Sequence, residues 1–487
     1  MTLLDIALST VFVSTAVVLV FSLGLVNVWK KNRKLPPGPW GLPFLGYYPF
    51  ISGKLYKNFT PLAKKYGDVF SFRTVGGKLV VVINGPKSIK EVFVNRSDEF
   101  NGRPPDCNVL EWISNGLGLI QEEGQVWKEH RRFFLHTVKN YGFGKIELEE
   151  VIHEEIKTLL DDMRATRGDP TDFDIPMAYA VNSVISHVLF RRKHDKDFFP
   201  KLIDAFHHLL EIFSSHRFLL VGFVFRYIAI QFFSWSSEIR RARTFARKVY
   251  RDIIDDHIYN YDPNHLKDYV DSYLHHIEKL KQEGKLFNSS FTRDRLIAIS
   301  MNMTMEGTET VSAAILCLLM RASGQPEEQK LVQKELDAVV GRDRLPSWQD
   351  RQNLPYFEAF IQELNRTGQS FYTTAQYSNY EDTTVNGYLI PKRSIIYANL
   401  WTINNDPVTF PEPEKFDVGR FLGKDGKKIK KEGPYPFGIG KRDCPGQSLA
   451  QMEAFLILAA IFQNFTLRPG NGNTTFRAIA RSDPKTE

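Results

Sequence analysis

The sequence predicts a mainly α-helical fold with small β-sheets and an N-terminal transmembrane helix. Residues 88–280 show mostly helical patterning, and Ala298–Met320 forms one long, mostly apolar helical segment. Val69–Ile83 reads as two strands around a Gly-Gly pair, which is typical of a β-hairpin, and the chain after Glu363–Arg366 turns to strand-like and irregular segments. Ile6–Val28 is almost continuously apolar.

The N-terminal apolar stretch predicts a permanent membrane anchor. Ile6–Val28 contains no charged residue, and about 20 such residues span a bilayer as an α-helix. Asp5 precedes the stretch and four basic residues follow it within positions 30–34, so the tip is expected in the lumen and the body in the cytosol. A cleaved signal peptide would have its charges first and small residues at its end. We therefore expect a transmembrane signal anchor over residues 1–29.

A basic and proline-rich hinge, residues 30–46, comes after the anchor. Pro36–Pro43 contains four prolines, which exclude a helix and favour a stiff, extended segment. Such a hinge would set the rest of the protein at a fixed angle to the membrane. No linker-like stretch or repeat divides residues 47–487, so they are expected to form one large domain with a sizeable core.

Cysteine usage and charge limit the compartment and the partners. Cys107, Cys317 and Cys444 form no CxxC pair and no even-numbered framework, which is typical of a reducing compartment. The formal net charge of +7 suits nucleic acid, an anionic membrane or an acidic protein. The sequence contains no nucleic-acid-binding module, so we expect a membrane and an acidic protein partner, and no nucleic acid. The lysine-rich run 424–431 is either a solvated loop or part of a docking face.

The loop Phe437–Gly446 (FGIGKRDCPG) contains the strongest chemical signal in the chain. Cys444 is a single cysteine in a glycine-punctuated loop, with Arg442 two residues before it and an apolar helical run behind it. A thiolate needs electropositive neighbours to stay ionised, and it can serve as one axial ligand of a metal. Glycines 438, 440 and 446 let the backbone curl around a flat cofactor and aim N–H groups at the sulfur. The alternative is a buried free cysteine in a glycine loop.

Read as F-x-x-G-x-R-x-C-x-G, this loop resembles the haem-binding loop of the cytochromes P450 at every fixed position. The resemblance implies haem b with its iron bound axially by the Cys444 thiolate. Residues that it places around the cofactor are Phe437, Gly438, Gly446 and Arg442.

Two earlier segments resemble further landmarks of that family, in the same order. Phe100–Pro104 comes first, and Trp127–Arg132 follows. Trp127 and Arg131 are four residues apart and share one helix face. An indole N–H and a guanidinium suit the two haem propionates, so the resemblance assigns Trp127, Arg131 and Arg442 to them.

The segment Glu306–Thr310 interrupts the apolar run of Ala298–Met320 with two acids and two hydroxyls. Such groups are costly in a buried helix unless they bond or do chemistry. It resembles the oxygen-activation site of P450s, where Gly307 would leave space for dioxygen and Thr310 would relay protons with help from Glu309. Gly307 is also expected to loosen the helix locally. The alternative is a kink in a structural helix.

Glu306 departs from the family, which normally has alanine at this position. Because Glu306 and Thr310 are four residues apart, both tend to face the same way. A carboxylate there must be protonated, paired with a cation or turned toward a water channel. The hypothesis is that Glu306 either extends the proton relay or selects a basic substrate.

A second departure concerns the strand region after Arg366. Family members often have Pro-His or Pro-Arg there to bond a propionate, and by spacing those positions are Gln376 and Tyr377. The resemblance therefore assigns Tyr377 to the cofactor, through its hydroxyl. Residues 105–120, 204–218, 301–310 and 370–376 would line the substrate pocket.

Glu363 and Arg366 are three residues apart on a predicted helix, as in the E-x-x-R pair of P450s. An ordinary surface ion pair is the alternative, worth less than about 1 kcal/mol. In the family the pair is buried and locks the scaffold under the cysteine loop, and Arg420 would complete the network. Val418 stands where family members usually have proline.

Together these segments resemble microsomal, family-2-type P450s of animals, over essentially the whole chain. The resemblance implies a haem-thiolate monooxygenase, an oxidoreductase that inserts one oxygen atom from O2 into a lipophilic small molecule. No flavin or nicotinamide domain is present in the sequence. Electrons would therefore come from a separate NADPH–cytochrome P450 reductase, with cytochrome b5 as a second partner and Lys128, Arg132 and Lys441 as docking charges. The expected location is the endoplasmic reticulum membrane, single-pass, with the catalytic domain 47–487 in the cytosol.

Two other functions remain open at this point. A haem-thiolate isomerase or dehydratase would rearrange a peroxide without electrons; Thr310 and Glu309 argue against it and Glu306 keeps it open. A non-catalytic haem-binding homologue is suggested only by the departures from the family pattern.

Overall fold

The computed structural model describes residues 34–104, 109–142, 146–193, 198–214, 236–368, 372–470 and 475–481. The predicted membrane anchor, residues 1–29, and the start of the hinge lie outside these ranges. The described hinge residues from 34 onward form no helix until Tyr48, as the prolines predicted.

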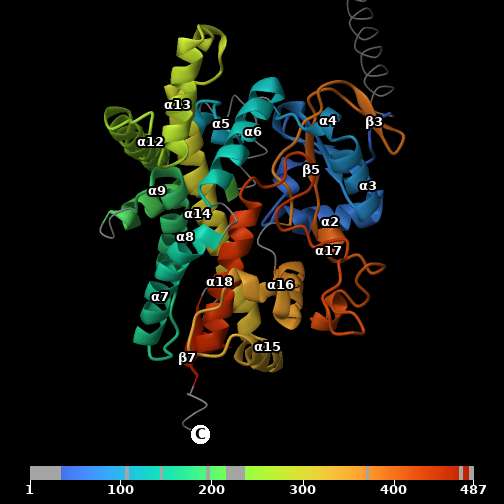
Figure 1. The fold of residues 1–487 in the computed structure, drawn as a ribbon. Helices are drawn as coiled ribbons and strands as arrows, with labels where there is room; N and C mark the ends of the chain where they lie inside the picture. Colours follow the sequence, from blue (N-terminus) through green and yellow to red (C-terminus); the bar gives the residue numbers. More distant parts are fainter. Residues whose placement is uncertain are drawn as a thin grey trace, which may run out of the picture.

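The described chain is mainly α-helical with small sheets, which confirms this part of the predicted fold class (Figure 1). The longer helices are α2 Leu55–Tyr66, α6 Gly124–Asn140, α7 Glu149–Ala165, α8 Asp174–Phe190, α9 Phe199–Ser214, α12 Ser236–Tyr259, α13 Tyr269–Gln282, α14 Arg293–Ser323, α15 Pro326–Val339, α16 Pro355–Gly368 and α18 Gln447–Asn464. Short helices are α3 Pro86–Lys90, α4 Ser97–Phe100, α5 Val109–Ser114 and α17 Trp401–Asn404. The strands are β1 Val69–Arg73, β2 Leu79–Ile83, β3 Thr383–Val385, β4 Tyr388–Ile390, β5 Ile395–Ala398, β6 Phe465–Pro469 and β7 Phe476–Ala480.

A three-stranded sheet joins the two ends of the domain. The predicted hairpin forms, with β1 and β2 antiparallel. The other edge of β2 pairs in parallel with β5, which lies more than 300 residues later in the chain. In this pairing Val80 lies opposite Ile395. Figure 1 shows the blue N-terminal elements beside the orange strand β5, away from the helices α7, α8, α12 and α13. Val80–Ile83 is buried throughout, as expected for a central strand covered on both faces.

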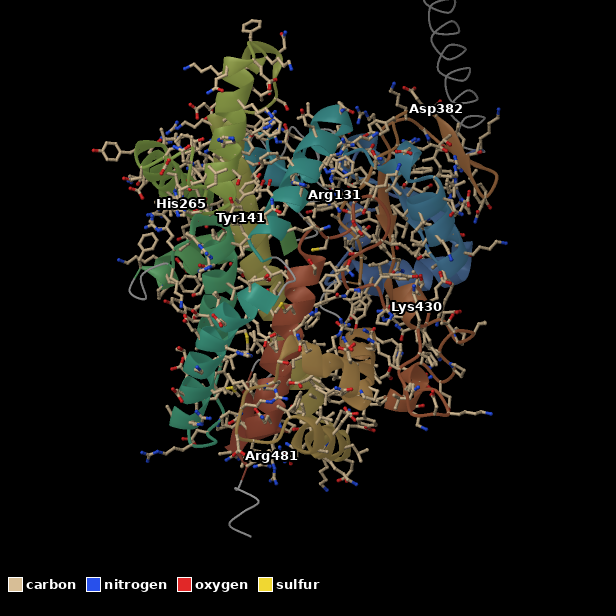
Figure 2. The ribbon with its side chains drawn as sticks, in the orientation of Figure 1. Arg131, Tyr141, His265, Asp382, Lys430 and Arg481 are labelled. Carbon is tan, nitrogen blue, oxygen red and sulfur yellow. The ribbon has the colours of Figure 1, made fainter. Side chains whose placement is uncertain are left out.

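Helix α14 lies at the centre of the helical part and packs on α8, α12, α16 and α18. The Thr292 hydroxyl caps it by accepting from the N–H of Arg295, and it runs unbroken for 31 residues. Among the described residues it is the one helix long and apolar enough to cross a membrane. These helix contacts, together with weaker ones to α9, α13 and α15, identify it as the core helix of this domain. The side chains that fill the space around it are drawn in Figure 2.

The last described strands close the lower end of the molecule. β6 and β7 form an antiparallel hairpin that contacts α14 and α18. Arg481, labelled at that end in Figure 2, pairs with Asp337 on α15 at 2.6 Å. The chain after the cysteine loop is therefore fixed to the core helices.

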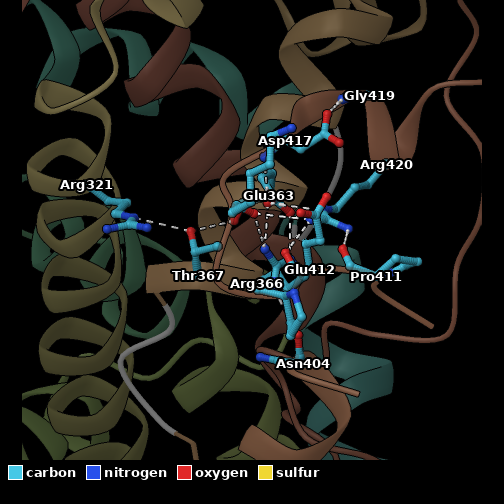
Figure 3. Close-up of polar contacts among 12 residues, drawn as sticks. Arg321, Glu363, Arg366, Thr367, Asn404, Pro411, Glu412, Asp417, Gly419 and Arg420 are labelled. Atoms are coloured by element: carbon cyan, nitrogen blue, oxygen red, sulfur yellow. Dashed lines mark hydrogen bonds and ion pairs between the residues drawn. The ribbon is translucent and has the colours of Figure 1, made fainter. Parts of the chain in front are cut away.

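A buried ion pair ties α16 to the irregular segment 404–420 (Figure 3). Arg366 donates from Nε and Nη2 to the two carboxylate oxygens of Glu363, both at 2.7 Å, and both side chains are fully buried. The same guanidinium donates to the carbonyl oxygens of Asn404 and Pro413. The pair is therefore part of the scaffold, and the alternative of a surface ion pair does not hold.

Arg420 joins this network, as its position in the sequence suggested. Its Nε lies 3.6 Å from Glu363 Oε1, and its other nitrogens donate to the carbonyls of Pro411 and Glu412. The short turn Val418–Phe421 that presents Arg420 forms with valine in place of the family's proline.

We expect Arg366→Leu to lower the free energy of unfolding by about 3–5 kcal/mol, because it leaves the Glu363 carboxylate buried without its main partner. The measurement is urea-induced unfolding followed by tryptophan fluorescence. Lys330→Leu is the matched control, since Lys330 pairs with Glu327 at the same three-residue spacing but both are largely exposed. That change should cost less than about 0.5 kcal/mol. Equal effects of the two substitutions would contradict the buried network.

Candidate active site

A cavity of about 1100 Å³ separates the middle of α14 from the cysteine loop. This volume lies slightly above the range of about 300–1,000 Å³ that is usual for small-molecule sites. Its walls include parts of α6, α8, α9, α14, α16 and α18, the segment 372–377 and the loop 434–447. Described residues from all four ranges expected to line the pocket do so, namely Leu119, Ile120, His207, Met303, Glu306, Gly307, Glu309, Thr310 and 372–376.

The cysteine loop is held in one conformation by a close backbone approach. Gly440 has φ 85°, and a Cβ at this position would lie 1.8 Å from the carbonyl oxygen of Phe93. Only glycine satisfies both conditions. The N–H of Cys444 donates to the carbonyl of Phe437 at 2.9 Å, and α18 begins three residues later. The loop therefore presents the Cys444 sulfur to the cavity, which Phe437, Gly438 and Gly446 also line.

Burial raises the pKa of the Cys444 thiol, and two groups act against this effect. The backbone N–H of Gly446 bonds the sulfur, as the glycine pattern predicted, and the Arg131 guanidinium lies close enough to favour the anion. Arg442, two residues before the cysteine, donates to the carbonyls of Asn101 and Glu122. Since burial outweighs these contacts, a thiolate at this position would need a further source of positive charge, which a bound metal cation would supply.

Two buried donors at the edge of the cavity have no acceptor among the described protein atoms. These donors are Trp127 Nε1 and Arg442 Nη1. The two side chains stack, with the central guanidinium carbon of Arg442 3.8 Å from the centre of the Trp127 ring. An unsatisfied buried donor costs about 1–3 kcal/mol. Arg131, labelled near the middle of the molecule in Figure 2, shares the α6 face of Trp127 and donates to the carbonyl and carboxylate of Asp443.

Arg103 adds a third guanidinium to this corner of the cavity. It is held by the carbonyls of Ile120 and Gln376. Burial, and then repulsion from Arg103, lowers the pKa of Arg442 to about 9. Three cations and two unpaired donors fit an anionic ligand with two carboxylates, which is what haem provides. Sequence reasoning assigned no role to Arg103, although it lies in the Phe100–Pro104 motif.

Tyr377 lies on the cavity wall beside this cluster. The Arg103 guanidinium lies over its ring at 5.2 Å, and Phe93 packs edge-on against it. Burial raises the pKa of its hydroxyl. The neighbouring Gln376 donates to the hydroxyl of Tyr397 at 2.7 Å. The structure thus brings Tyr377 to the anion-binding corner, where the sequence expected it.

Thr310 and Gly307 lie on the α14 wall of the cavity. The Thr310 hydroxyl donates to the carbonyl of Glu306 at 2.7 Å. A Cβ at Gly307 would point toward α8 and lie 3.5 Å from Ile185. The prediction that Gly307 loosens the helix is wrong, because α14 is regular α-helix through this position.

The two acids of α14 have different surroundings. Glu309 Oε2 lies 3.1 Å from Nε2 of His207 on α9, and His207 also approaches Asp174 at 3.7 Å. Hydrogen bonding to Glu309 raises the pKa of His207. Glu306 has no such partner: its Oε1 is buried without a hydrogen bond, and burial together with the charge of Glu309 raises its pKa to about 7. No sequence signal links His207 to Glu309, because they lie on different helices.

Comparisons with known proteins agree with this geometry. The family model described as Cytochrome P450 matches residues 36–478. Cytochrome P450 18a1 of Drosophila melanogaster is 35% identical over 456 residues, which cover 91% of this chain and 83% of that protein. Cytochrome P450 2C8 of Homo sapiens is 35% identical over 463 residues, covering 94% and 93% respectively. Cytochrome P450 2C5 of Oryctolagus cuniculus is 34% identical over 450 residues, covering 91% of each.

We expect Trp127→Phe to weaken haem retention by about five- to tenfold, because it removes one charge-assisted hydrogen bond while keeping the ring under Arg442. The measurement is the rate of haem transfer to an excess of apomyoglobin. Trp112→Phe is the control, since Trp112 also stacks with an arginine, Arg243 at 4.5 Å, but does not line the cavity. Equal transfer rates in wild type and Trp127→Phe would exclude an acceptor at this corner.

Proposed function

The chain belongs to the cytochrome P450 family, and from that premise we propose a membrane-anchored haem-thiolate monooxygenase that oxidises a lipophilic small molecule with electrons from a separate reductase. Proteins of this family are oxidoreductases that hold haem b through an axial cysteine thiolate. The observation that supports the proposal most is the cavity between Cys444 and Thr310, with its unsatisfied donors at Trp127 and Arg442.

The residues that would hold the haem come from three parts of the chain. Cys444 would bind the iron as a thiolate, and Phe437, Gly438 and Gly446 of its loop would enclose that side. The propionates would be bound by Trp127, Arg131 and Arg442, with Arg103 and Tyr377 beside them. The bound group supplies dioxygen activation, which the thiolate favours by pushing electron density toward the metal.

Proton delivery would use Thr310, Glu309 and His207. His207 is about two-fifths exposed and hydrogen-bonds Glu309, whereas Glu309 and Thr310 line the cavity. A proton taken up by His207 from solvent can therefore pass to Glu309 and then to the cavity near the Thr310 hydroxyl, through water where direct contact is lacking. Because residue 307 is glycine, no side chain from this position occupies the α14 wall next to Thr310.

A lipophilic substrate is supported by the apolar part of the lining. Ile185, Met303, Ala314 and Leu318 contribute side chains to the cavity. Met301 and Met305 are fully buried and lie outside the lining, so only Met303 of the three methionines is placed to contact a substrate. Such walls exclude water from the reacting groups.

Reductase and cytochrome b5 would dock near the cysteine loop. Lys128 and Arg132 are exposed on α6, and Lys441 is exposed within the loop, where it pairs with Asp98 at 2.5 Å. Lys428 of the 424–431 run instead neutralises the buried Glu358 and has a structural role. Basic side chains around the loop are complementary to an acidic electron donor.

A location on the endoplasmic reticulum membrane is supported by exposed residues within and just after the proline-rich segment. Trp40 is 92% exposed and Phe44 is 76% exposed, near the end of the predicted anchor. Large exposed apolar side chains at such a place are suited to a membrane surface. The catalytic domain would then lie against the cytosolic leaflet.

We expect Cys444→Ala to abolish the carbon monoxide difference band that is typical of thiolate-bound haem, and to abolish NADPH- and reductase-dependent product formation. Cys317→Ala is the control, because Cys317 is the other described free cysteine and does not line the cavity. A band that persists in Cys444→Ala would disprove the ligand assignment. Product formation without reductase or NADPH would indicate an isomerase or dehydratase instead.

Thr310→Val should lower the fraction of NADPH electrons recovered in product by about tenfold or more, with hydrogen peroxide formed instead, because the hydroxyl next to the proton route is lost. The readout is product and peroxide per NADPH consumed. Thr304→Val is a matched control: Thr304 lies on the same helix and makes the same kind of bond, to Ser300, but outside the cavity. Unchanged coupling in Thr310→Val would remove Thr310 from the proton route.

A further inference from the structure

Glu306 is an acid on the cavity wall without a counter-ion. Its Oε1 is buried and makes no hydrogen bond, and the groups coupled to its charge are the acid Glu309 and the thiol of Cys444, neither of which is a cation. Of the basic side chains that line the cavity, Arg103, Arg131 and Arg442 gather at the corner of Trp127. His207 pairs with Glu309 and Arg351 pairs with Glu358, and the remaining one, Lys54, makes no ion pair with Glu306. An ionised carboxylate in such a place is costly unless it is paired.

Glu309, one helical turn away, is an acid whose charge is compensated by a neighbouring basic side chain. His207 lies 3.1 Å from its carboxylate, so charge is balanced within the protein. Glu358, a third acid of the cavity lining, is paired with Arg351 at 2.9 Å and with Lys428. Glu306 lines the same cavity and differs from both, because no cation among the described residues is paired with it.

We propose that Glu306 is the recognition residue for a cationic nitrogen in the substrate, so that the preferred substrates are lipophilic ammonium ions. This inference rests on the proposed monooxygenase function and specifies the class of molecule that the same cavity accepts. The apolar side chains of Ile185 and Met303 line the cavity with Glu306 and would contact the hydrocarbon part of such a substrate.

A cationic ligand also explains the protonation behaviour of Glu306. The burial that raises its pKa to about 7 leaves the carboxyl poised between its neutral and ionised forms near physiological pH. A positive charge within about 4–6 Å favours the ionised form. The site can therefore be neutral when no substrate is bound and ionised when an ammonium ion is present.

The position of Glu306 argues against a role in proton delivery. Glu309 reaches the partly exposed His207, but no described donor connects Glu306 to the surface. A group that relays protons must be reloaded from solvent, whereas a group that recognises a substrate needs only to face the cavity. Of the two roles considered for Glu306 from the sequence, recognition fits its surroundings.

The test compares two probes of the same shape on the full-length holoenzyme. One is 4-phenylbutyltrimethylammonium, which carries a permanent charge and cannot ligate iron; the other is its neutral analogue with a tert-butyl group. Equilibrium dialysis measures both affinities without turnover. We expect wild type to bind the cation at least about tenfold more tightly, and Glu306→Gln to lose this preference while its affinity for the neutral probe changes by less than about twofold.

Glu358→Gln is the matched control, because it removes an equal charge from a cavity-lining acid that is already paired, and it should retain the preference. Glu306→Ala serves as a second variant, and an unchanged carbon monoxide spectrum shows that each variant holds its haem. Equal affinity of wild type for the two probes, or a cation preference that persists in both Glu306 variants, would overturn the proposal. Loss of the thiolate-type spectrum or of reductase-dependent turnover in wild type would instead refute the proposed function.

Discussion

The sulfur of Cys444 must be an anion in a buried place, and the surrounding structure depends on that requirement. Burial raises the pKa of the thiol, and the protein offers only the Gly446 N–H and the nearby Arg131 guanidinium in return. Those contacts orient the sulfur without offsetting its full desolvation. A metal ion supplies the rest, because a coordinating thiol loses its proton outright. The close approach of Gly440 to Phe93 then keeps the loop in the one conformation that presents the sulfur to the cavity.

Charge in the cavity is unevenly distributed, and this asymmetry assigns its two regions to different ligands. Arg103, Arg131 and Arg442 leave one corner with an excess of positive charge, and their mutual repulsion contributes to the lowered pKa of Arg442. The α14 wall has the opposite excess, at Glu306. A cofactor with two carboxylates satisfies the first region. A substrate that is neutral leaves the second unsatisfied, whereas a cationic one completes it.

The sequence predicted those parts of the site that depend on local spacing. Trp127 and Arg131 share a face because they are four residues apart on α6, and the cysteine loop is contiguous, so its glycine pattern already implied the N–H bond to the sulfur. Contacts between distant elements could be predicted only where the family resemblance supplied them, as for Arg420 and the Glu363–Arg366 pair. The ion pair of His207 with Glu309 joins α9 to α14, and neither helix contains a local signal for it.

One expectation about local structure failed for a physical reason. Gly307 does not loosen α14, because α8 packs against the helix there and Thr308 accepts a hydrogen bond from Asn182. A tertiary contact outweighed the preference suggested by the neighbouring sequence.

The two acids of α14 repel each other, and they depend on different cations. The charge of Glu309 adds to burial in raising the pKa of Glu306. His207 lies 3.1 Å from the Glu309 carboxylate and balances that acid from within the protein. A cation held at Glu306 would lower the pKa of Glu306 again, because a nearby positive charge favours the ionised form. The same turn of α14 would therefore use a protein cation at Glu309 and a substrate cation at Glu306, so that charge on the cavity wall is balanced only when the substrate is in place.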